Sequence, residues 1–197
     1  MVTEITRPLT VEEYIQLEKE LERPAEFEGG KLIEMGGVSK EHNKIVRNLI
    51  ALLWNIFKET GEVEIYGSDL RVHIPGTRRY YYPDLVITKG REQFAEDLPD
   101  TLLNPVLLIE VLSESTEARD RGIKFETYRQ LDSLQEYVLL AQDQPKAELF
   151  RRTGEGDWLV GPVVQEFDQV VALRSLSAHL PMAEIYRGLT FTPSSKA

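Results

Sequence analysis

The sequence predicts an α/β fold with a mixed central sheet flanked by helices and a β-rich part added at its C-terminal end. Residues 106–112 are almost wholly apolar, which is typical of a central strand covered on both faces. Residues 39–61 carry apolar side chains at helical spacing, which indicates a long amphipathic helix. From residue 147 onward, runs of strand-forming residues follow at short intervals.

Local signals in the N-terminal part begin with a helix. Thr10 and Glu13 have the spacing of a capping box, and Pro24 ends the segment that follows them. Gly29-Gly30 lies between apolar residues, which indicates a hairpin of two short strands. Ser39 can cap the long helix. The next strand-like runs lie at 62–66, 70–74 and 84–88.

The second half predicts a strand, helix, strand unit. A polar loop precedes the strand at 106–112, and Ser115 or Thr116 can cap a helix that continues to Leu131. The chain then returns as a strand at 137–141. The C-terminal part follows with strands at 148–152, 158–160 and 170–173 and a short helix near 182–186.

Length and composition limit what the protein can be. The 197 residues favour one domain, with 190–197 as a flexible tail. Because the sequence has no cysteine, any metal must bind to oxygen or imidazole. No charged leader or membrane-spanning run is present, so we expect a cytoplasmic protein. The net charge of −10 opposes nonspecific binding to a polyanion, so a nucleic-acid role requires a local basic patch.

Glu110 is the most informative residue for chemistry, because it lies within the apolar run 106–112, where an unpaired carboxylate is costly to bury. A metal cation, a lysine or a proton can each satisfy it. Asp84 follows Pro83 at the head of another apolar strand. Two acids on neighbouring strands would provide hard oxygen ligands for Mg²⁺ or Mn²⁺.

A third element lies on the following helix. Asp120 and Lys124 are four residues apart and share one helix face, from which Lys124 can reach back over the strand end. An ammonium there can hold an attacking water or offset charge in a phosphoryl-transfer transition state. On spacing alone, a solvent-exposed ion pair is the alternative.

The motif Pro83-Asp84, followed by a strand containing Glu110, resembles the signature of restriction-endonuclease-like nucleases, the PD-(D/E)XK superfamily. The longer pattern is similar to the Uma-two family of endonucleases within it, over about residues 10 to 150. Its matching positions include Glu26, His42, Asp120, Lys124 and Tyr128.

The resemblance implies a DNA endonuclease that depends on Mg²⁺ or Mn²⁺, often a homodimer. Leu112 stands where the superfamily lysine is expected, and Lys124 is its implied substitute. The resemblance also implies a site role for Glu26 and a metal-ligating backbone carbonyl at Val111. The catalytic set is therefore Asp84, Glu110, Lys124 and Glu26, with the metal on Asp84, Glu110 and Val111.

Several interpretations stay open in the sequence. Glu26 can equally be a surface residue of the hairpin, and His42 can be a capping or core histidine. The basic and aromatic stretch from Arg78 and Arg79 to Tyr82 can face a nucleic-acid strand or form a polar hairpin with edge-strand tyrosines. A noncatalytic interaction module with a retained acid pair, or a hydrolase of another phosphate ester, are the alternatives to a nuclease.

Overall fold

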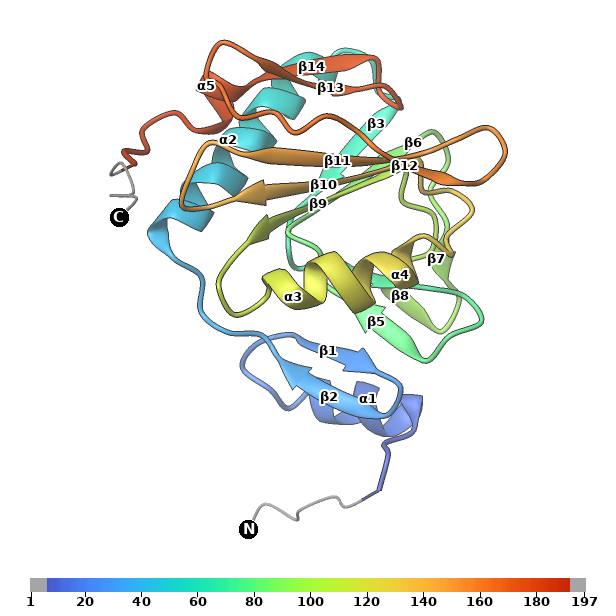
Figure 1. The fold of residues 1–197 in the computed structure, drawn as a ribbon. Helices are drawn as coiled ribbons and strands as arrows, with labels where there is room; N and C mark the ends of the chain where they lie inside the picture. Colours follow the sequence, from blue (N-terminus) through green and yellow to red (C-terminus); the bar gives the residue numbers. More distant parts are fainter. Residues whose placement is uncertain (1–6, 192–197) are drawn as a thin grey trace.

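Two six-stranded β-sheets organise residues 7–191, the part of the chain that the computed structural model describes (Figure 1). The first sheet has the order β12-β11-β10-β9-β6-β3, in which β9 and β10 are parallel and the other pairs antiparallel. Its strands are Val63–Tyr66 (β3), Leu85–Lys89 (β6), Leu107–Leu112 (β9), Glu136–Ala141 (β10), Ala147–Arg152 (β11) and Trp158–Val160 (β12). The α/β class with a mixed sheet is confirmed.

The second sheet has the order β2-β1-β5-β4-β8-β7. Its strands are Ala25–Glu28 (β1), Lys31–Glu34 (β2), Arg71–His73 (β4), Arg79–Tyr81 (β5), Phe94–Ala95 (β7) and Leu98–Leu102 (β8). The sequence did not predict the division of the strands into two large sheets. It also treated the segment before β9 as a polar loop, whereas the structure forms β7 and β8 there.

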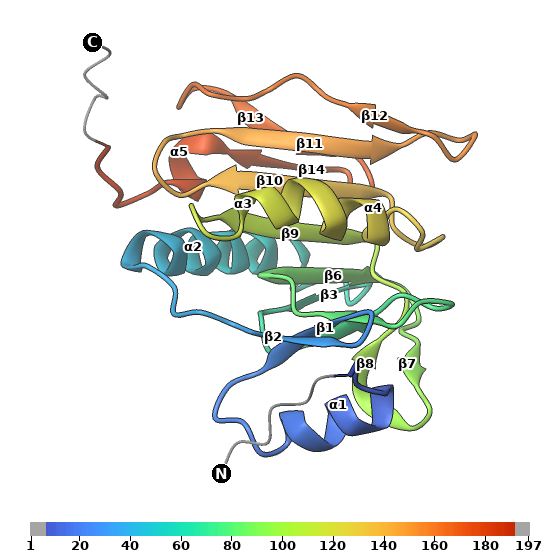
Figure 2. The ribbon, with the colours of Figure 1, turned by 60° about the horizontal axis from the view of Figure 1, so that its bottom comes forward.

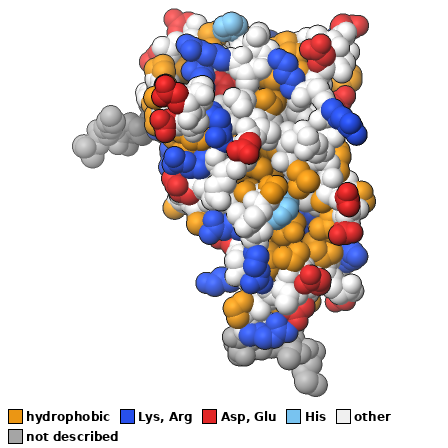
Figure 3. All heavy atoms as spheres, turned by 90° about the vertical axis from the view of Figure 1, so that its right-hand side faces the viewer, with side chains coloured by type: hydrophobic (Ala, Val, Ile, Leu, Met, Phe, Trp, Pro, Cys, Tyr) orange, Lys and Arg blue, Asp and Glu red, His pale blue; other side chains and the backbone are white. Residues whose placement is uncertain are grey.

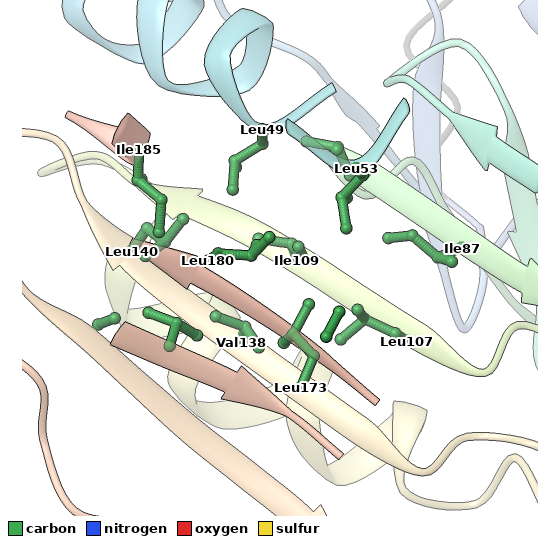
Figure 4. Close-up of a cluster of buried hydrophobic side chains, with 14 of the residues drawn as sticks. Leu49, Leu53, Ile87, Leu107, Ile109, Val138, Leu140, Leu173, Leu180 and Ile185 are labelled. Carbon is green, nitrogen blue, oxygen red and sulfur yellow. The ribbon is translucent and has the colours of Figure 1, made fainter. Parts of the chain in front are cut away.

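One face of the first sheet is covered by the long helix α2 (Lys40–Phe57) and by the C-terminal elements. These are β13 (Val170–Leu173), β14 (Ala178–Pro181) and α5 (Met182–Ile185). Figure 4 shows Leu49 and Leu53 of α2 directed toward Ile87 and Ile109 of the sheet. This apolar layer holds α2 against β6 and β9, so the start of the helix stays beside the carboxyl end of β9.

The opposite face carries the connection between β9 and β10, which Figure 2 shows lying across the sheet. The sequence predicted one helix here, capped by Ser115 or Thr116. The structure instead has α3 (Glu117–Arg119), a π-helical turn η1 (Asp120–Lys124) and α4 (Phe125–Tyr128), and Thr116 makes no side-chain cap. A π-helical turn is wider than an α-helical turn and is common at functional sites. Here both of its end residues are buried.

Alternation along β9 follows the sequence prediction. Leu107, Ile109 and Val111 belong to the core beneath α2, whereas Leu108 and Leu112 belong to the core beneath η1 and α4. Glu110 shares the second face because side chains alternate along a strand. It therefore lies beneath the π-helical turn.

The N-terminal helix α1 (Val11–Glu18) begins at the predicted capping box, in which Thr10 and Glu13 bond to each other's backbone N–H. The predicted hairpin forms through Gly29 and Gly30, with φ of 58° and 106°. A side chain at Gly30 would meet Pro8, because a Cβ there would lie 2.6 Å from the Pro8 Cβ. The glycine is thus required both by the turn and by the close approach of the chain before α1.

Two further observations concern the chain end and membrane association. The Phe191 ring lies 5.6 Å from that of Tyr186, and residues 192–197 of the predicted tail lie outside the described range. Within residues 7–191, every helix is too short or too polar to cross a bilayer.

Candidate functional site

Asp84 and Glu110 lie side by side at the junction of β6 and β9. The antiparallel pairing sets Leu85 opposite Ile109, which brings the residue before β6 opposite Glu110. The backbone N–H of Asp84 donates to Glu110 Oε2 at 3.2 Å, and the N–H of Val111 donates to Asp84 Oδ2 at 2.7 Å. Both carboxyl groups are buried. The expected pairing of the two acids is therefore present in the geometry.

Lys124 reaches this pair from the π-helical turn. Its Nζ lies 3.0 Å from Glu110 Oε1, 2.9 Å from Glu26 Oε1 and 3.2 Å from Asp120 Oδ1. Its side chain is 7% exposed, so the alternative of a solvent-exposed ion pair with Asp120 is wrong. Lys124 is the cation around which acids from β1, β9 and η1 gather.

Glu26 comes from β1 of the other sheet and is also buried, which excludes the alternative of a surface position. Besides Lys124, its carboxylate accepts a hydrogen bond from Arg119 NH2 at 2.8 Å and one from the Tyr82 N–H at 3.4 Å. Arg119 NH2 also bonds Glu28. These contacts join the second sheet to the site, although Glu26 lies 84 residues before Glu110 in the chain.

The structure adds two residues to the site. The role of His42 was left open in the sequence, and Tyr128 was given no role there. His42, in the first turn of α2, places Nε2 2.9 Å from Asp84 Oδ1. The Tyr128 hydroxyl donates to Glu110 Oε1 at 3.2 Å. Tyr128 follows Lys124 by four residues, so its helical spacing was a usable signal. For His42 no local signal exists, because its contact depends on how α2 packs on the sheet.

The basic and aromatic stretch before Asp84 lies in a hairpin of β4 and β5, as one of the two sequence interpretations has it, but inside the sheet rather than at its edge. Arg78 bonds the Leu9 carbonyl, and Arg79 NH1 bonds Thr127 Oγ1 at 2.6 Å. Tyr80, Tyr81 and Tyr82 are all buried, and β5 lies inside its sheet between β1 and β4. The tyrosines therefore form no edge strand, and of the three Tyr82 alone borders the cavity at the site.

The carboxyl groups line a cavity of about 450 Å³ that opens between two chain segments. One is the segment that joins β2 to α2, and the other is the loop between β9 and α3 (Figure 1). The lining also includes Ser39, Arg119 and Gln142, and Ser39 Oγ donates to Gln142 Oε1 at 2.7 Å. The acids thus lie within reach of a ligand that enters this cavity.

Electrostatics in the cluster are dominated by an excess of acids. Burial raises the pKa of Glu110 well above its ordinary value; Lys124 opposes the shift, while the nearby acids Asp120, Asp84 and Glu26 add to it. Burial alone would lower the pKa of Lys124, but the carboxylates of Glu110, Glu26 and Asp120 outweigh it and raise that pKa. The acids around Lys124 therefore favour its ammonium form, and they compete for too little positive charge.

The donor set suits a hard divalent cation. Buried acids outnumber cations in the cluster. The cations are Lys124 and the half-buried Arg119, and His42 lies beside Asp84. The four buried carboxyl groups are those of Glu26, Asp84, Glu110 and Asp120. Within residues 7–191, Asp120 Oδ1 is buried and accepts no hydrogen bond of good geometry, although Lys124 Nζ is nearby. No three His, Asp or Glu residues of this range are arranged as a ready metal site. Any cation must therefore be completed by water or backbone oxygen.

For Val111, the structure shows its N–H bound to Asp84. Its carbonyl as a metal ligand stays a prediction. The same holds for the chemical roles of Asp84, Glu110, Lys124 and Glu26, whose proximity is now established by geometry.

Comparison with solved structures supports the fold class. A crystal structure described as "a putative nuclease belonging to DUF820", from Anabaena variabilis, superposes with a TM-score of 0.73 at 20% identity, covering 91% of this chain and 98% of that one. The two chains thus share one α/β architecture. At this identity the likeness concerns the fold.

Sequence comparisons are more specific. Two proteins of Synechocystis, named "Uncharacterized protein slr1290" and "Uncharacterized protein sll1609", are 35% and 34% identical; the first match covers 93% of this chain and 94% of the relative, the second 84% and 93%. A family model described as "Uma2: Putative restriction endonuclease" matches residues 11–183. The chain belongs to the Uma2 family, and the resemblance stated from the sequence is confirmed.

Proposed function

We propose that this protein is an endonuclease that hydrolyses phosphodiester bonds in DNA with Mg²⁺ or Mn²⁺. The observation that carries the proposal is the meeting of Asp84, Glu110, Glu26 and Lys124, from separate elements, at one cavity. Membership of the Uma2 family supports the reaction class. Metal-dependent hydrolysis requires hard oxygen ligands beside a cation that can offset charge on the reacting phosphate.

In this proposal Asp84 and Glu110 hold the divalent cation, with the Val111 carbonyl as a backbone ligand. A bound cation would acidify a coordinated water and neutralise charge on the scissile phosphate. Each carboxylate oxygen has two lone pairs, so the hydrogen bonds of Asp84 and Glu110 leave acceptor capacity on both. The bonds from His42 and Tyr128 hold these carboxylates in fixed orientations.

Lys124 acts as a donor, because its neighbours keep it protonated. When a phosphate enters the cavity, the ammonium can hold the attacking water and stabilise the negative charge that develops on the phosphate oxygens. Glu26 sets the position of that ammonium from the opposite side, through the 2.9 Å contact with Nζ. This accounts for its place in the site without requiring it to bind the metal directly.

A cleavage assay on supercoiled plasmid with Mn²⁺ or Mg²⁺ tests the proposal. The wild type should nick or linearise the plasmid, and Glu110→Gln and Lys124→Met should each reduce the rate at least a hundredfold, as for loss of a group that stabilises transition-state charge. Calorimetry should show cation binding by the wild type and a large loss of it in Glu110→Gln.

Glu136→Gln is the matched control. Glu136 is a buried, ion-paired acid on β10, the strand next to β9, but it lies outside the cavity lining. Its variant loses a buried charge and should still cleave at the wild-type rate per folded molecule. If Glu110→Gln, Lys124→Met and Glu136→Gln all lost cleavage activity to the same extent, the loss would be due to impaired folding. Absence of both cleavage and cation binding in the wild type would refute the nuclease and favour the interaction module.

Two organisational proposals accompany this function. We infer that residues 1–197 form one domain, which should unfold in a single cooperative transition in urea. We also infer a homodimer, which light scattering after gel filtration would detect as twice the mass of 22.6 kDa. A monomer at all concentrations tested would refute the second point and leave the chemistry untouched.

A further inference from the structure

The acids of the site are buried in the lining of the cavity. Asp84 is 8% exposed and Glu110 3% exposed, and Lys124, which contacts Glu110, is buried as well. A phosphodiester must therefore enter the cavity to reach them. The cavity of about 450 Å³ is comparable to pockets that enclose one small molecule. An unpaired nucleotide can enter a space of this size, whereas a base that is paired and stacked in a duplex is held outside it.

The charge of the lining also opposes duplex binding. Duplex DNA is held mainly by lysine and arginine contacts to its phosphates. Among the described residues that line the cavity, the cationic ones are Arg119 and Lys124, apart from His42, against six acids. Figure 3 shows another face of the molecule, on which Lys and Arg are scattered among acidic, hydrophobic and uncharged side chains and no continuous basic surface forms. The cavity thus offers few phosphate contacts, as suits a short length of one strand.

The lining is divided between apolar and polar side chains. Ile33, Met35 and Val38 come from β2 and the segment after it, and Val38 is 53% exposed. The loop after β9 contributes Ser113 and its hydroxyl neighbours instead. Apolar surface suits the face of an unstacked base, whereas hydroxyl groups suit sugar and phosphate oxygens.

Arg119 adds a specific phosphate contact. Within the described part of the chain, both of its hydrogen bonds, to Glu26 and Glu28, leave from NH2. Its Nε and NH1 keep their donors, and the side chain is 29% exposed at the cavity. A guanidinium held on one side by acids presents its other edge in a fixed orientation.

We propose that the cavity binds one unpaired strand of nucleic acid, with a base against the Met35 and Val38 side and a phosphate on Arg119. This deepens the proposed nuclease function and rests on it. The substrate class is then single-stranded DNA, or an unpaired segment within a duplex, rather than paired duplex. Supercoiled plasmid contains such unpaired segments, so the assay above remains suitable.

Two measurements with one oligonucleotide sequence test this. With Mn²⁺, the full chain should cleave the single strand, and the unpaired segment of a bubble, at least tenfold faster than the paired duplex. With Ca²⁺, fluorescence polarisation should show at least tenfold tighter binding of the single strand. Cleavage of paired duplex as fast as single strand would overturn the inference and leave the nuclease standing. Single-strand preference in binding without any cleavage would overturn the nuclease and keep the strand site.

Variants locate the strand in the cavity. Arg119→Gln should weaken single-strand binding and reduce the slope of log affinity against log salt by about 0.7, the change expected for one lost phosphate contact. Arg121→Gln is its control, because Arg121 bonds Glu117 and Glu148 outside the cavity lining. An unchanged slope in Arg119→Gln would refute its phosphate role.

The apolar side is tested with an exposed residue, so that folding is not at risk. Val38→Asp should lower single-strand affinity at least tenfold, while Val163→Asp, at a residue 42% exposed and outside the lining, should leave it unchanged. Equal affinities of Val38→Asp and wild type would overturn the placement of the strand.

Discussion

Removing the ammonium of Lys124 tests the electrostatic description of the site directly. Lys124→Met keeps most of the side-chain volume and deletes the charge that lies 2.9 to 3.2 Å from the carboxylates of Glu26, Glu110 and Asp120. At such distances one ion pair corresponds to about 5 kcal/mol at an effective dielectric constant near 20, before the cost of desolvation is subtracted. Three acids would then share one buried space without a cation.

The net loss should be smaller than the sum of those attractions, because the stranded carboxyl groups take up protons. Breaking a buried ion pair from one side costs about 3 to 5 kcal/mol. For a chain of this size, 1 kcal/mol corresponds to about 2 to 4 °C in Tm, so Lys124→Met should lower Tm by about 6 to 20 °C at pH 8. The deficit should shrink toward pH 4, where the acids are protonated in the unfolded chain as well.

Thermal unfolding followed by circular dichroism, without divalent cation, measures this. The double variant Lys124→Met with Glu110→Gln should recover at least about 1 kcal/mol, because one of the stranded charges is gone. If Lys124→Met lowers Tm by less than about 2 °C, and by the same amount at every pH, Lys124 does not neutralise the cluster.

Three further predictions concern single positions. Burial raises the pKa of Glu110 in the folded state, so the wild type loses stability as the pH rises from the pKa of the unfolded state toward that of the folded state. The Tm of Glu110→Gln relative to that of the wild type should therefore increase between pH 5 and pH 8 in metal-free buffer. A Tm difference that stays constant with pH would contradict this. Glu136→Gln should cost about 2 kcal/mol in urea unfolding, since its carboxylate accepts bonds from Arg151 and from the chain after β13; no loss would show these bonds to be weak. Gly30→Ala should destabilise more than Gly29→Ala, because only at Gly30 does a Cβ collide with neighbouring chain; equal Tm values would refute the close approach.

Local signals in the sequence were sufficient for much of the fold. The capping box at Thr10, the Gly29-Gly30 hairpin, the cap at Ser39 and the alternation along β9 all appear in the structure as expected. These features depend either on interactions between residues a few positions apart or on the two-residue period of a strand. Both can be recognised in a single sequence. The acid pair was also accessible, because a carboxylate inside an apolar strand must find a partner.

Other elements were missed for a common reason. β7, β8 and β14 were not predicted, and the hairpin interpretation placed the tyrosines of β5 at a sheet edge. β5 carries arginine and tyrosine side chains whose burial depends on contacts with distant segments, such as Arg79 with Thr127. The π-helical turn is likewise absent from the local pattern, which is that of one continuous helix. Strand propensity is weak evidence where the neighbours that bury a strand are unknown.

By itself the sequence determined the helix and strand periodicity, the positions of Asp84 and Glu110 on apolar strands, and membership of a recognisable family. Only the tertiary structure decided that Glu26 reaches Lys124 and His42 reaches Asp84, that the tyrosines before Asp84 are buried, and that the site lies in a cavity. The physical reason is separation along the chain: His42 and Asp84 are 42 residues apart, and their contact exists only after α2 packs against the sheet.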